Sequence, residues 1–296
     1  MRSRARPPRT ATAFFHLRSR DEACRLSAMK IHVLVENTAN SPELVAEHGL
    51  SLLIEACGKR ILFDTGATGA FADNAEHMGI NLSEVDVAVL SHGHYDHGGG
   101  VARFLALNSH ATVWMSPHAF APHFNASGKD IGLAPELQQH SQLCSASAPV
   151  LPLAPGITLH QANDMPMAYP CAGDGMETID NGIRTADTFR HEQYLLIEEN
   201  NRRVLISGCS HRGILNISAY FQPDVLIGGF HYMRAGEETL RHAAEQLLKQ
   251  PSIYYTGHCT GDTAFLYLKQ HLGNRLHAFR TGDTIELSTP HHYART

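Results

Sequence analysis

Four side chains that commonly bind metal ions fall within six consecutive residues of this chain. His92, His94, Asp96 and His97 directly follow the apolar run 85–90. Imidazole nitrogens and carboxylate oxygens are ligands that zinc, iron and manganese accept. A helix would spread these residues around its circumference, so we predict a loop at the carboxyl end of a strand. His92 and His94 would bind one metal, and Asp96 and His97 a second, as in two-metal hydrolytic sites.

The alternative interpretation of this stretch is a solvated loop that happens to be rich in histidine. The spacing, the apolar run before it and the glycines at 98–100 agree instead with a metal-binding loop. The pattern His-x-His-x-Asp-His resembles, residue for residue, the motif of the metallo-β-lactamase fold superfamily. The resemblance implies a centre of two divalent metal ions. Zinc is favoured, although His, Asp and Cys ligands also accept iron and manganese.

A two-metal site needs about three protein ligands per ion, so further ligands must come from downstream. The candidates lie at strand edges or just beyond predicted strand ends: His191, Cys209, His211, His231 and His258. His258 follows a strand and lies in a loop flanked by glycines, where the backbone can approach a metal closely. We therefore expect it to join Asp96 and His97, with an ordinary surface histidine as the alternative.

The superfamily places a third histidine ligand just before a hairpin and a bridging ligand just after it. By this resemblance His191 would join His92 and His94, and Cys209, 18 residues later, would take the shared position. A thiolate is chemically sound there because metal binding deprotonates a cysteine. The alternative for Cys209 is a small buried apolar side chain at a strand end.

Three further residues have less certain assignments in the sequence. His211 lies two residues past Cys209 and is an alternative to His191 or Cys209 as a ligand, or a proton donor in the pocket. His231 is either a contact for substrate or proton transfer, or an ordinary loop histidine. Asp64 precedes Thr65 and Gly66 after a strand and resembles the first motif of the superfamily, in which the carboxylate orients the histidine loop instead of binding metal.

Other motifs narrow the resemblance, which spans roughly residues 30–287. They are Val35–Thr38, Phe189–Gln193, Ser207–Ile214 and Tyr255–Gly261. Together they resemble the branch named for 7,8-dihydropterin-6-yl-methyl-4-(β-D-ribofuranosyl)aminobenzene 5′-phosphate synthase. The Gly-Cys-Ser-His motif departs from the Gly-Asp of ordinary hydrolases in the superfamily, so their mechanism does not transfer directly.

The expected activity is that of a metal-dependent hydrolase or transferase acting on a small molecule. Metal-bound water would attack an ester, lactone or phosphoester, Asp96 would take its proton, and His211 or His231 would protonate the leaving group. In a synthase the metals would instead stabilise a pyrophosphate leaving group. Hydrolysis of a small lactone, ester or phosphodiester is the alternative within this class, and a ligand-sensing protein without turnover is the alternative outside it.

Composition limits the classes of protein that remain. The chain has 296 residues, 43% hydrophobic and 18% charged, with a formal net charge of −5. That charge argues against a general nucleic-acid partner, and no apolar run approaches the length of a membrane span. The six cysteines form no Cys-x-x-Cys pair, which is typical of reduced thiols in a cytoplasmic enzyme. Oligomeric state is not predicted.

The order of predicted elements favours an α/β protein, specifically an αββα sandwich of two mixed sheets flanked by helices. Two hairpins, at 50–63 and 194–207, are each followed by a metal-type residue and a helix. We expect one domain over residues 29–290, with an irregular insertion at about 117–185 covering the metal site or forming a plain surface excursion. Residues 1–28, rich in arginine, are interpreted as a disordered extension or an upstream misread start, with a basic targeting peptide as the alternative.

Overall fold

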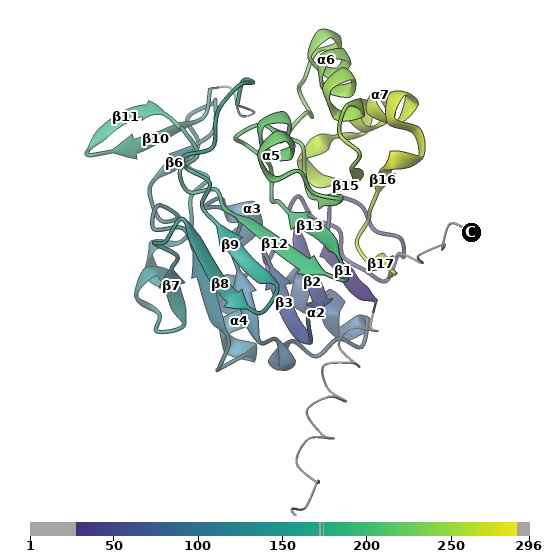
Figure 1. Ribbon diagram of the computed structural model, residues 1–296. Coiled ribbons are helices and arrows are strands. Elements are labelled where there is room, and N and C mark those ends of the chain that lie inside the picture. Colours follow the sequence, from purple (N-terminus) through teal and green to yellow (C-terminus); the bar gives the residue numbers. More distant parts are fainter. Residues whose placement is uncertain (1–27, 172, 174, 289–296) are drawn as a thin grey trace, which may run out of the picture.

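Two large β-sheets pack face to face, and helices cover their outer surfaces (Figure 1). The computed structural model describes residues 28–171, 173 and 175–288. Each large sheet has seven strands, and a smaller sheet of three strands lies at one end. The predicted αββα sandwich is therefore confirmed.

The first sheet has the strand order β17-β1-β2-β3-β4-β5-β7. Its strands are β1 (Met29–Val35), β2 (Ser51–Ala56), β3 (Lys59–Phe63), β4 (Val87–Val89), β5 (Thr112–Met115), β7 (Leu143–Ser145) and β17 (Thr284–Leu287). Cys57 and Gly58 join β2 to β3 with φ of 51° and 70°, as a two-residue hairpin requires. Because β3, β4, β5 and β7 are parallel, their carboxyl ends meet at one edge.

The second sheet repeats this arrangement, in the order β16-β15-β14-β13-β12-β9-β8. Its strands are β8 (Val150–Ala154), β9 (Ile157–His160), β12 (Tyr194–Glu199), β13 (Arg202–Ile206), β14 (Val225–Ile227), β15 (Ile253–Thr256) and β16 (Leu276–Ala278). The hairpin β12–β13 turns at Asn200 and Asn201, and β13 to β16 are parallel. The loops after β13, β14 and β15 therefore reach the same edge of the sandwich.

Alternation along the strands divides the core into three layers. Ile31 and Val33 of β1 pack with Ile197 and Ile206 of the second sheet in the layer between the sheets. The outer face of the first sheet packs against α2 (Ala70–His77) and α4 (Val101–Leu107). The outer face of the second packs against α5 (Ile214–Phe221), α6 (Glu237–Leu248) and α7 (Asp262–Leu272).

The region 117–185 differs from the irregular insertion that we expected, because it contributes strands to all three sheets. β7 extends the first sheet, and β8 and β9 extend the second. β6 (His123–Phe124), β10 (Glu177–Asp180) and β11 (Ile183–Ala186) form the small sheet, whose β10–β11 hairpin projects from the body (Figure 1). These strands are short, and β8 is an edge strand that contains Pro152, so the sequence lacks the usual strand pattern.

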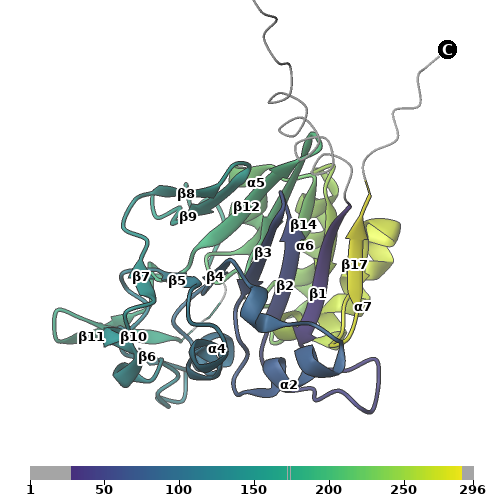
Figure 2. The ribbon, with the colours of Figure 1, turned by 90° about the horizontal axis from the view of Figure 1, so that it is seen from below.

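Two other expectations concern the ends of the chain and membranes. The interpretation of residues 1–28 lies almost entirely outside the described residues. Within the part of the chain that is described, none of the helices has the length and apolar character needed to span a bilayer. Strand β17 pairs antiparallel with β1, so the last described strand lies beside the first (Figure 2).

Candidate metal centre

The histidine loop begins where β4 ends, at the edge at which the parallel strands finish. His92 lies in a bend and His94 on extended backbone, whereas Asp96 and His97 lie on α3 (Tyr95–Gly98), a single helical turn. The predicted loop is therefore partly helical. One turn does not scatter the ligands, because consecutive helical residues differ in direction by only about 100°.

Asp64 makes the contacts expected of a residue that orients this loop. Its Oδ1 accepts a hydrogen bond from the Ser91 N–H at 2.6 Å. Its Oδ2 accepts from the Ser91 hydroxyl and from His97 Nδ1, both at 2.7 Å. Asp64 has φ +61°, a conformation that residues other than glycine seldom adopt and that often accompanies functional sites. The carboxylate thus joins the end of β3 to the loop after β4.

Three histidines have their Nδ1 atoms occupied by neighbouring groups. His92 Nδ1 lies 2.7 Å from Ser91 Oγ, His97 Nδ1 contacts Asp64, and His258 Nδ1 lies 3.0 Å from Asn37 Oδ1. Such contacts leave Nε2 as the ligand atom. His92 Nε2 is buried and has no hydrogen-bond partner among the described residues. A buried polar atom without a partner is costly, so a bound cation fits this donor set.

The first half of the centre is formed by His92, His94 and His211. Their ligand atoms lie within 4.8 Å of one another, and all three side chains are buried. Burial, together with the neighbouring histidines, lowers the pKa of each well below the ordinary value. The imidazoles are therefore neutral at pH 7, which is the form that binds a metal ion.

His191 does not join this group, contrary to our first assignment. Its Nδ1 accepts the Gly93 N–H at 2.9 Å, and its Nε2 lies 3.3 Å from Asp187 Oδ2. The structure instead places His211, the alternative considered for this position, beside His92 and His94. Both histidines flank the same hairpin, and the turn at Ser210, with φ +58°, directs the chain so that His211 lies in the centre.

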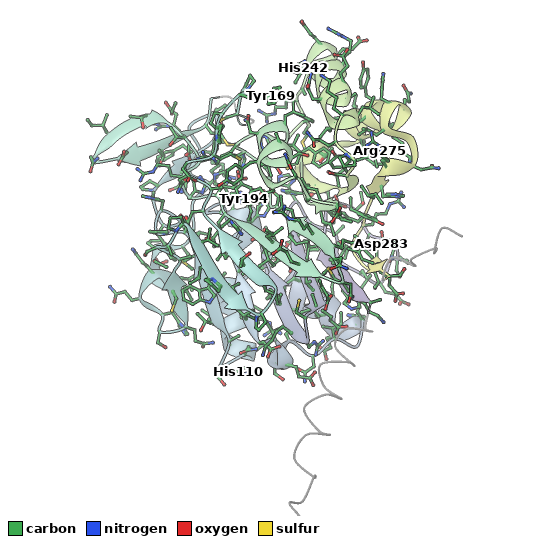
Figure 3. The ribbon with its side chains drawn as sticks, in the orientation of Figure 1. His110, Tyr169, Tyr194, His242, Arg275 and Asp283 are labelled. Carbon is green, nitrogen blue, oxygen red and sulfur yellow. The ribbon has the colours of Figure 1, made fainter. Side chains whose placement is uncertain are left out.

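Glu192 and Phe189 hold His211 in position. Glu192 Oε1 accepts the His211 N–H at 2.7 Å. Its Oε2 accepts the Arg212 N–H at 3.0 Å and the hydroxyl of Tyr194 at 2.7 Å, and Tyr194 lies in the interior of the molecule (Figure 3). Burial raises the pKa of Glu192. The Phe189 ring stacks on His211 with centroids 4.6 Å apart, so Glu192 fixes the backbone of His211 and Phe189 packs against its ring.

The second half of the centre is formed by Asp96, His97 and His258. His97 Nε2 lies 3.2 Å from His258 Nε2, and Asp96 Oδ2 lies 3.5 Å from the same His258 atom. Burial alone would raise the pKa of Asp96, but His97 and His258 outweigh it and lower the pKa overall. For His97, burial is outweighed by Asp64 and Asp96, and the pKa is raised. The structure brings these three predicted ligands together.

Cys209 lies between the two halves. Its Sγ is 3.1 Å from His97 Nε2 and belongs to one group with His92 and His97 and to another with His258 and Cys259. Burial, followed by the nearby Cys259 thiol, raises the Cys209 pKa well above its ordinary value. A thiolate at this position therefore needs a bound cation beside it. This placement suits the shared position that the resemblance implied.

Glu36 and Asn37 anchor His258 from the end of β1. Glu36 Oε1 accepts the His258 N–H at 2.6 Å, and Asn37 Nδ2 donates to the His258 carbonyl at 3.2 Å. Thr281 donates its hydroxyl to the Glu36 carbonyl at 3.2 Å. Sequence reasoning treated Glu36 and Asn37 only as part of a motif, since nothing in the sequence shows that β1 and the loop after β15 meet.

Two more histidines border the centre. His231, with φ +54°, has its ring centroid 4.4 Å from that of His211. His48 was missed by the sequence analysis: its side chain is 52% exposed and its Nε2 lies 3.4 Å from Asp96 Oδ2. Among 21 histidines, a single one between Glu47 and Gly49 carries no signal of its own. His48 marks the side on which the centre opens to solvent.

The architecture and donor set define a class of protein: an α/β sandwich with a candidate metal centre of His, Asp and Cys side chains along one edge. Residues 44–167 match the family model of the metallo-beta-lactamase superfamily. The 7,8-dihydropterin-6-methyl-4-(beta-D-ribofuranosyl)-aminobenzene-5'-phosphate synthase of Methanocaldococcus jannaschii is 30% identical over 265 residues, covering 80% of this chain and 89% of the relative. An uncharacterised protein of the same organism is 29% identical, covering 81% of this chain and 94% of that one.

Solved structures agree with this match. Tm1679, a metal-dependent hydrolase of the beta-lactamase superfamily, has a TM-score of 0.76 and 27% sequence identity, covering 88% of this chain and 99% of that one. Zinc-bound PqqB from Methylobacterium extorquens has a TM-score of 0.54 and 12% identity, covering 87% and 100%, and shows likeness of fold alone. The chain belongs to the metallo-β-lactamase superfamily.

Proposed function

We propose that this protein is a metal-dependent hydrolase or transferase with a dinuclear centre. The observation that carries the proposal is the convergence of two ligand groups, His92–His94–His211 and Asp96–His97–His258, on either side of the Cys209 thiol. Two divalent ions, zinc by preference, would lower the pKa of a bound water from about 16 toward about 7 and polarise a substrate oxygen. The residues around the centre would control access and proton movement.

Asp96 is suited to orient an attacking water where the centre meets solvent. Its side chain is 13% exposed, and His48 lies beside it at the surface. A carboxylate with a lowered pKa remains ionised at pH 7 and accepts a hydrogen bond from an attacking water. His48 would close that side of the pocket and contact the incoming substrate.

His231 would orient the substrate and not donate a proton from a charged form. Burial and the neighbouring His258 lower its pKa to about 4, so the ring is neutral at pH 7. A neutral imidazole accepts one hydrogen bond and donates another. We therefore assign His211 to the ligand set and leave His231 as the histidine that contacts the leaving group.

The substrate class that we favour is a small molecule carrying a phosphate ester. The relative of 30% identity is named as a synthase of a ribofuranosyl-aminobenzene 5'-phosphate, and a dinuclear centre stabilises the charge of phosphoryl oxygens. In the transferase version the metals would bind a pyrophosphate leaving group. The predicted lid role of residues 117–185 belongs to this proposal, because Gly173 lies close to His211.

Substitution of His211 tests the proposal. His211→Ala should lose one equivalent of zinc relative to wild type and reduce hydrolysis of bis(p-nitrophenyl) phosphate at least about 100-fold, since a ligand to one of two ions is removed. Zinc is measured by mass spectrometry of the desalted protein, and turnover by absorbance.

The matched control is His110→Ala, which removes an exposed histidine at the lower end of the molecule in Figure 3. It should keep the zinc content and turnover of wild type. Full zinc content and full turnover in His211→Ala would contradict the proposed centre. Panels of lactones and thioesters run with the same proteins would separate the alternative hydrolase activities.

A further inference from the structure

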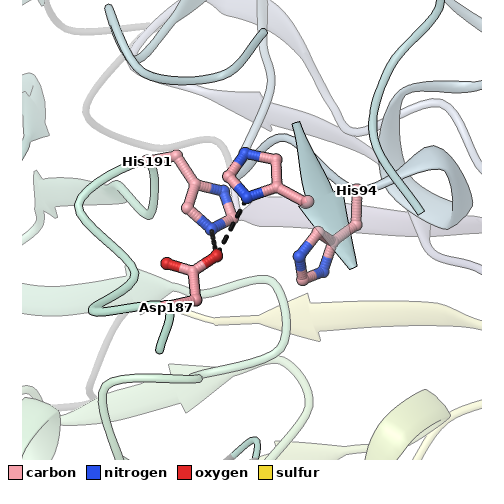
Figure 4. Close-up of side chains that lie close together, drawn as sticks. His94, Asp187 and His191 are labelled. Carbon is pink, nitrogen blue, oxygen red and sulfur yellow. Dashed lines mark hydrogen bonds and ion pairs between the residues drawn. The ribbon is translucent and has the colours of Figure 1, made fainter. Parts of the chain in front are cut away.

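A second buried cluster of metal-ligating side chains lies on the far side of His94. It consists of His94, His123, Asp187 and His191, whose ligand atoms lie within 4.8 Å of one another. Figure 4 shows His94, Asp187 and His191 of this cluster. Apart from His94, none of these residues takes part in the proposed reaction. The cluster joins the histidine loop to β6 and to the segment between β11 and β12.

One carboxylate oxygen holds the cluster together. Asp187 Oδ2 lies 2.9 Å from His123 Nδ1 and 3.3 Å from His191 Nε2. The rings of His123 and His191 stack with centroids 3.9 Å apart. The Asp187 side chain is only 3% exposed, so three ligand atoms converge at a point that solvent barely reaches.

The cluster contains polar atoms that the described protein does not satisfy. His123 Nε2 and His94 Nε2 are buried and have no hydrogen-bond partner among the described residues. Buried polar atoms are almost always paired, and an exception calls for an explanation such as an ion. The donors here are three imidazoles and one carboxylate, which is a ligand set typical of zinc.

Charge also favours a cation at this place. Among the described residues, the Asp187 carboxylate pairs with His123 and His191 and with no Lys or Arg side chain. A buried carboxylate is stable only when it is paired with a positive charge or fully hydrogen-bonded.

We propose that His123, Asp187 and His191 bind a third divalent ion of the zinc class, separate from the dinuclear centre. His94 belongs to both groups of ligand atoms and would provide the fourth ligand when the dinuclear centre does not engage it. The site does not depend on the reaction proposed above. It would tie the small three-stranded sheet to the histidine loop.

The competing explanation is that Asp187 simply holds the two histidines by hydrogen bonds. The variant Asp187→Asn distinguishes this explanation from a bound cation. Its amide oxygen still accepts a hydrogen bond but carries no charge to attract a cation. The matched control is His118→Ala, which removes a half-buried histidine near His191 that is not part of the cluster.

The experiment measures zinc bound to the full chain after chelator treatment, reconstitution with zinc alone and desalting. We expect Asp187→Asn to bind one equivalent less than wild type and His118→Ala to match wild type. In a His211→Ala background, Asp187→Asn should still remove one equivalent, so this site is tested independently of the dinuclear centre. Equal zinc contents in Asp187→Asn and wild type would overturn the proposal.

A second variant keeps the proposal testable if Asp187→Asn fails to fold. His123→Gln removes a ligand but keeps a hydrogen-bonding side chain of similar reach, and circular dichroism verifies that it is folded. It should also bind one equivalent less. A folded His123→Gln protein with the full zinc content of wild type would likewise overturn the proposal.

Discussion

At the scale of single residues, hydrogen bonds to Nδ1 determine which nitrogen each histidine presents to the centre. Ser91, Asp64 and Asn37 occupy Nδ1 of His92, His97 and His258 respectively. These partners come from three different segments of the chain. The donor geometry therefore depends on residues that bind no metal themselves, as is usual for metal centres in proteins.

Asn37→Ala should weaken zinc binding about 10- to 100-fold, the usual cost of losing such a partner. His258 would lose its contacts with Asn37 Oδ1 and Nδ2 and no longer hold Nε2 toward the centre. Affinity is measured by competition with a chromophoric chelator. Asn40→Ala is the control, because Asn40 bonds to Asp283 at the surface, and equal affinities of the two variants would contradict the assigned role of Asn37.

The sequence identified the adjacent candidate ligands from their spacing alone, whereas the scattered candidates Cys209, His211 and His258 depended on predicted strand ends and on the family resemblance. His92, His94, Asp96 and His97 are readable because their spacing is itself the signal. His191 and His211 could not be ranked by spacing, since both flank the hairpin β12–β13 and only the turn at Ser210 decides which one lies in the centre. His48 and Glu192 are solitary residues whose roles appear only when distant loops meet.

At the scale of elements, the histidine loop is packed so closely that glycine is required within it. A Cβ atom on Gly93 would lie 2.1 Å from the carbonyl oxygen of Ala119. The backbone at Ala119 cannot move aside as the end of a flexible side chain would. The segment after β5 therefore presses against the loop and fixes its path between His92 and His94.

Gly93→Ala should lower the free energy of unfolding by about 1–3 kcal/mol or more, the usual cost of overpacking. Gly236→Ala, at the start of α6, is the matched control, because a Cβ there meets nothing within 4 Å and φ is −76°. Urea unfolding followed by circular dichroism measures both. Similar stabilities of the two variants would mean that the loop can move away from Ala119.

Elements were predictable where strands are buried and where helices have one apolar face. The sequence predicted the two hairpins at 50–63 and 194–207, which are β2–β3 and β12–β13 in the structure. It did not reveal most of the strands between 117 and 185, because β6, β7, β8, β10 and β11 are two to five residues long and largely half-buried or exposed. Short edge strands lack the alternation on which sequence patterns depend.

At the scale of the whole molecule, two similar halves bring their loops to one edge. In each half a hairpin is followed by three further parallel strands. The first half contributes the histidine loop, and the second contributes Cys209, His211 and His258. The centre therefore exists only when both sheets are assembled, and its many buried histidines couple folding to pH.

The zinc-free protein should lose stability as the pH falls below about 6.5. Burial lowers the pKa of His191 and His231 to about 4 and lowers those of His92, His94 and His211 well below the ordinary value. The unfolded chain binds protons at these residues first, near pH 6.5, so acid favours unfolding. His97, whose pKa is raised, acts in the opposite sense but is outnumbered.

We expect the melting temperature of chelator-treated protein to fall by at least about 5 °C between pH 7.5 and pH 5.5, since about 1 kcal/mol corresponds to 2–4 °C in a chain of this size. Differential scanning fluorimetry measures it. Zinc-loaded protein is the comparison and should change less, because protons must first displace the metal. An unchanged melting temperature in the zinc-free protein would show that these histidines are not held neutral by burial.

The pairing of β17 with β1 has a practical consequence. Met29 lies opposite Leu287, so the first and last strands of the described chain meet at one corner. Strand β1 then runs about 20 Å before Glu36 contacts His258, which separates that corner from the chemistry. Met29 and Leu287 are thus suitable points for tethering the molecule to a surface, and a short peptide joining these two residues would allow the chain to be reopened elsewhere as a circular permutant.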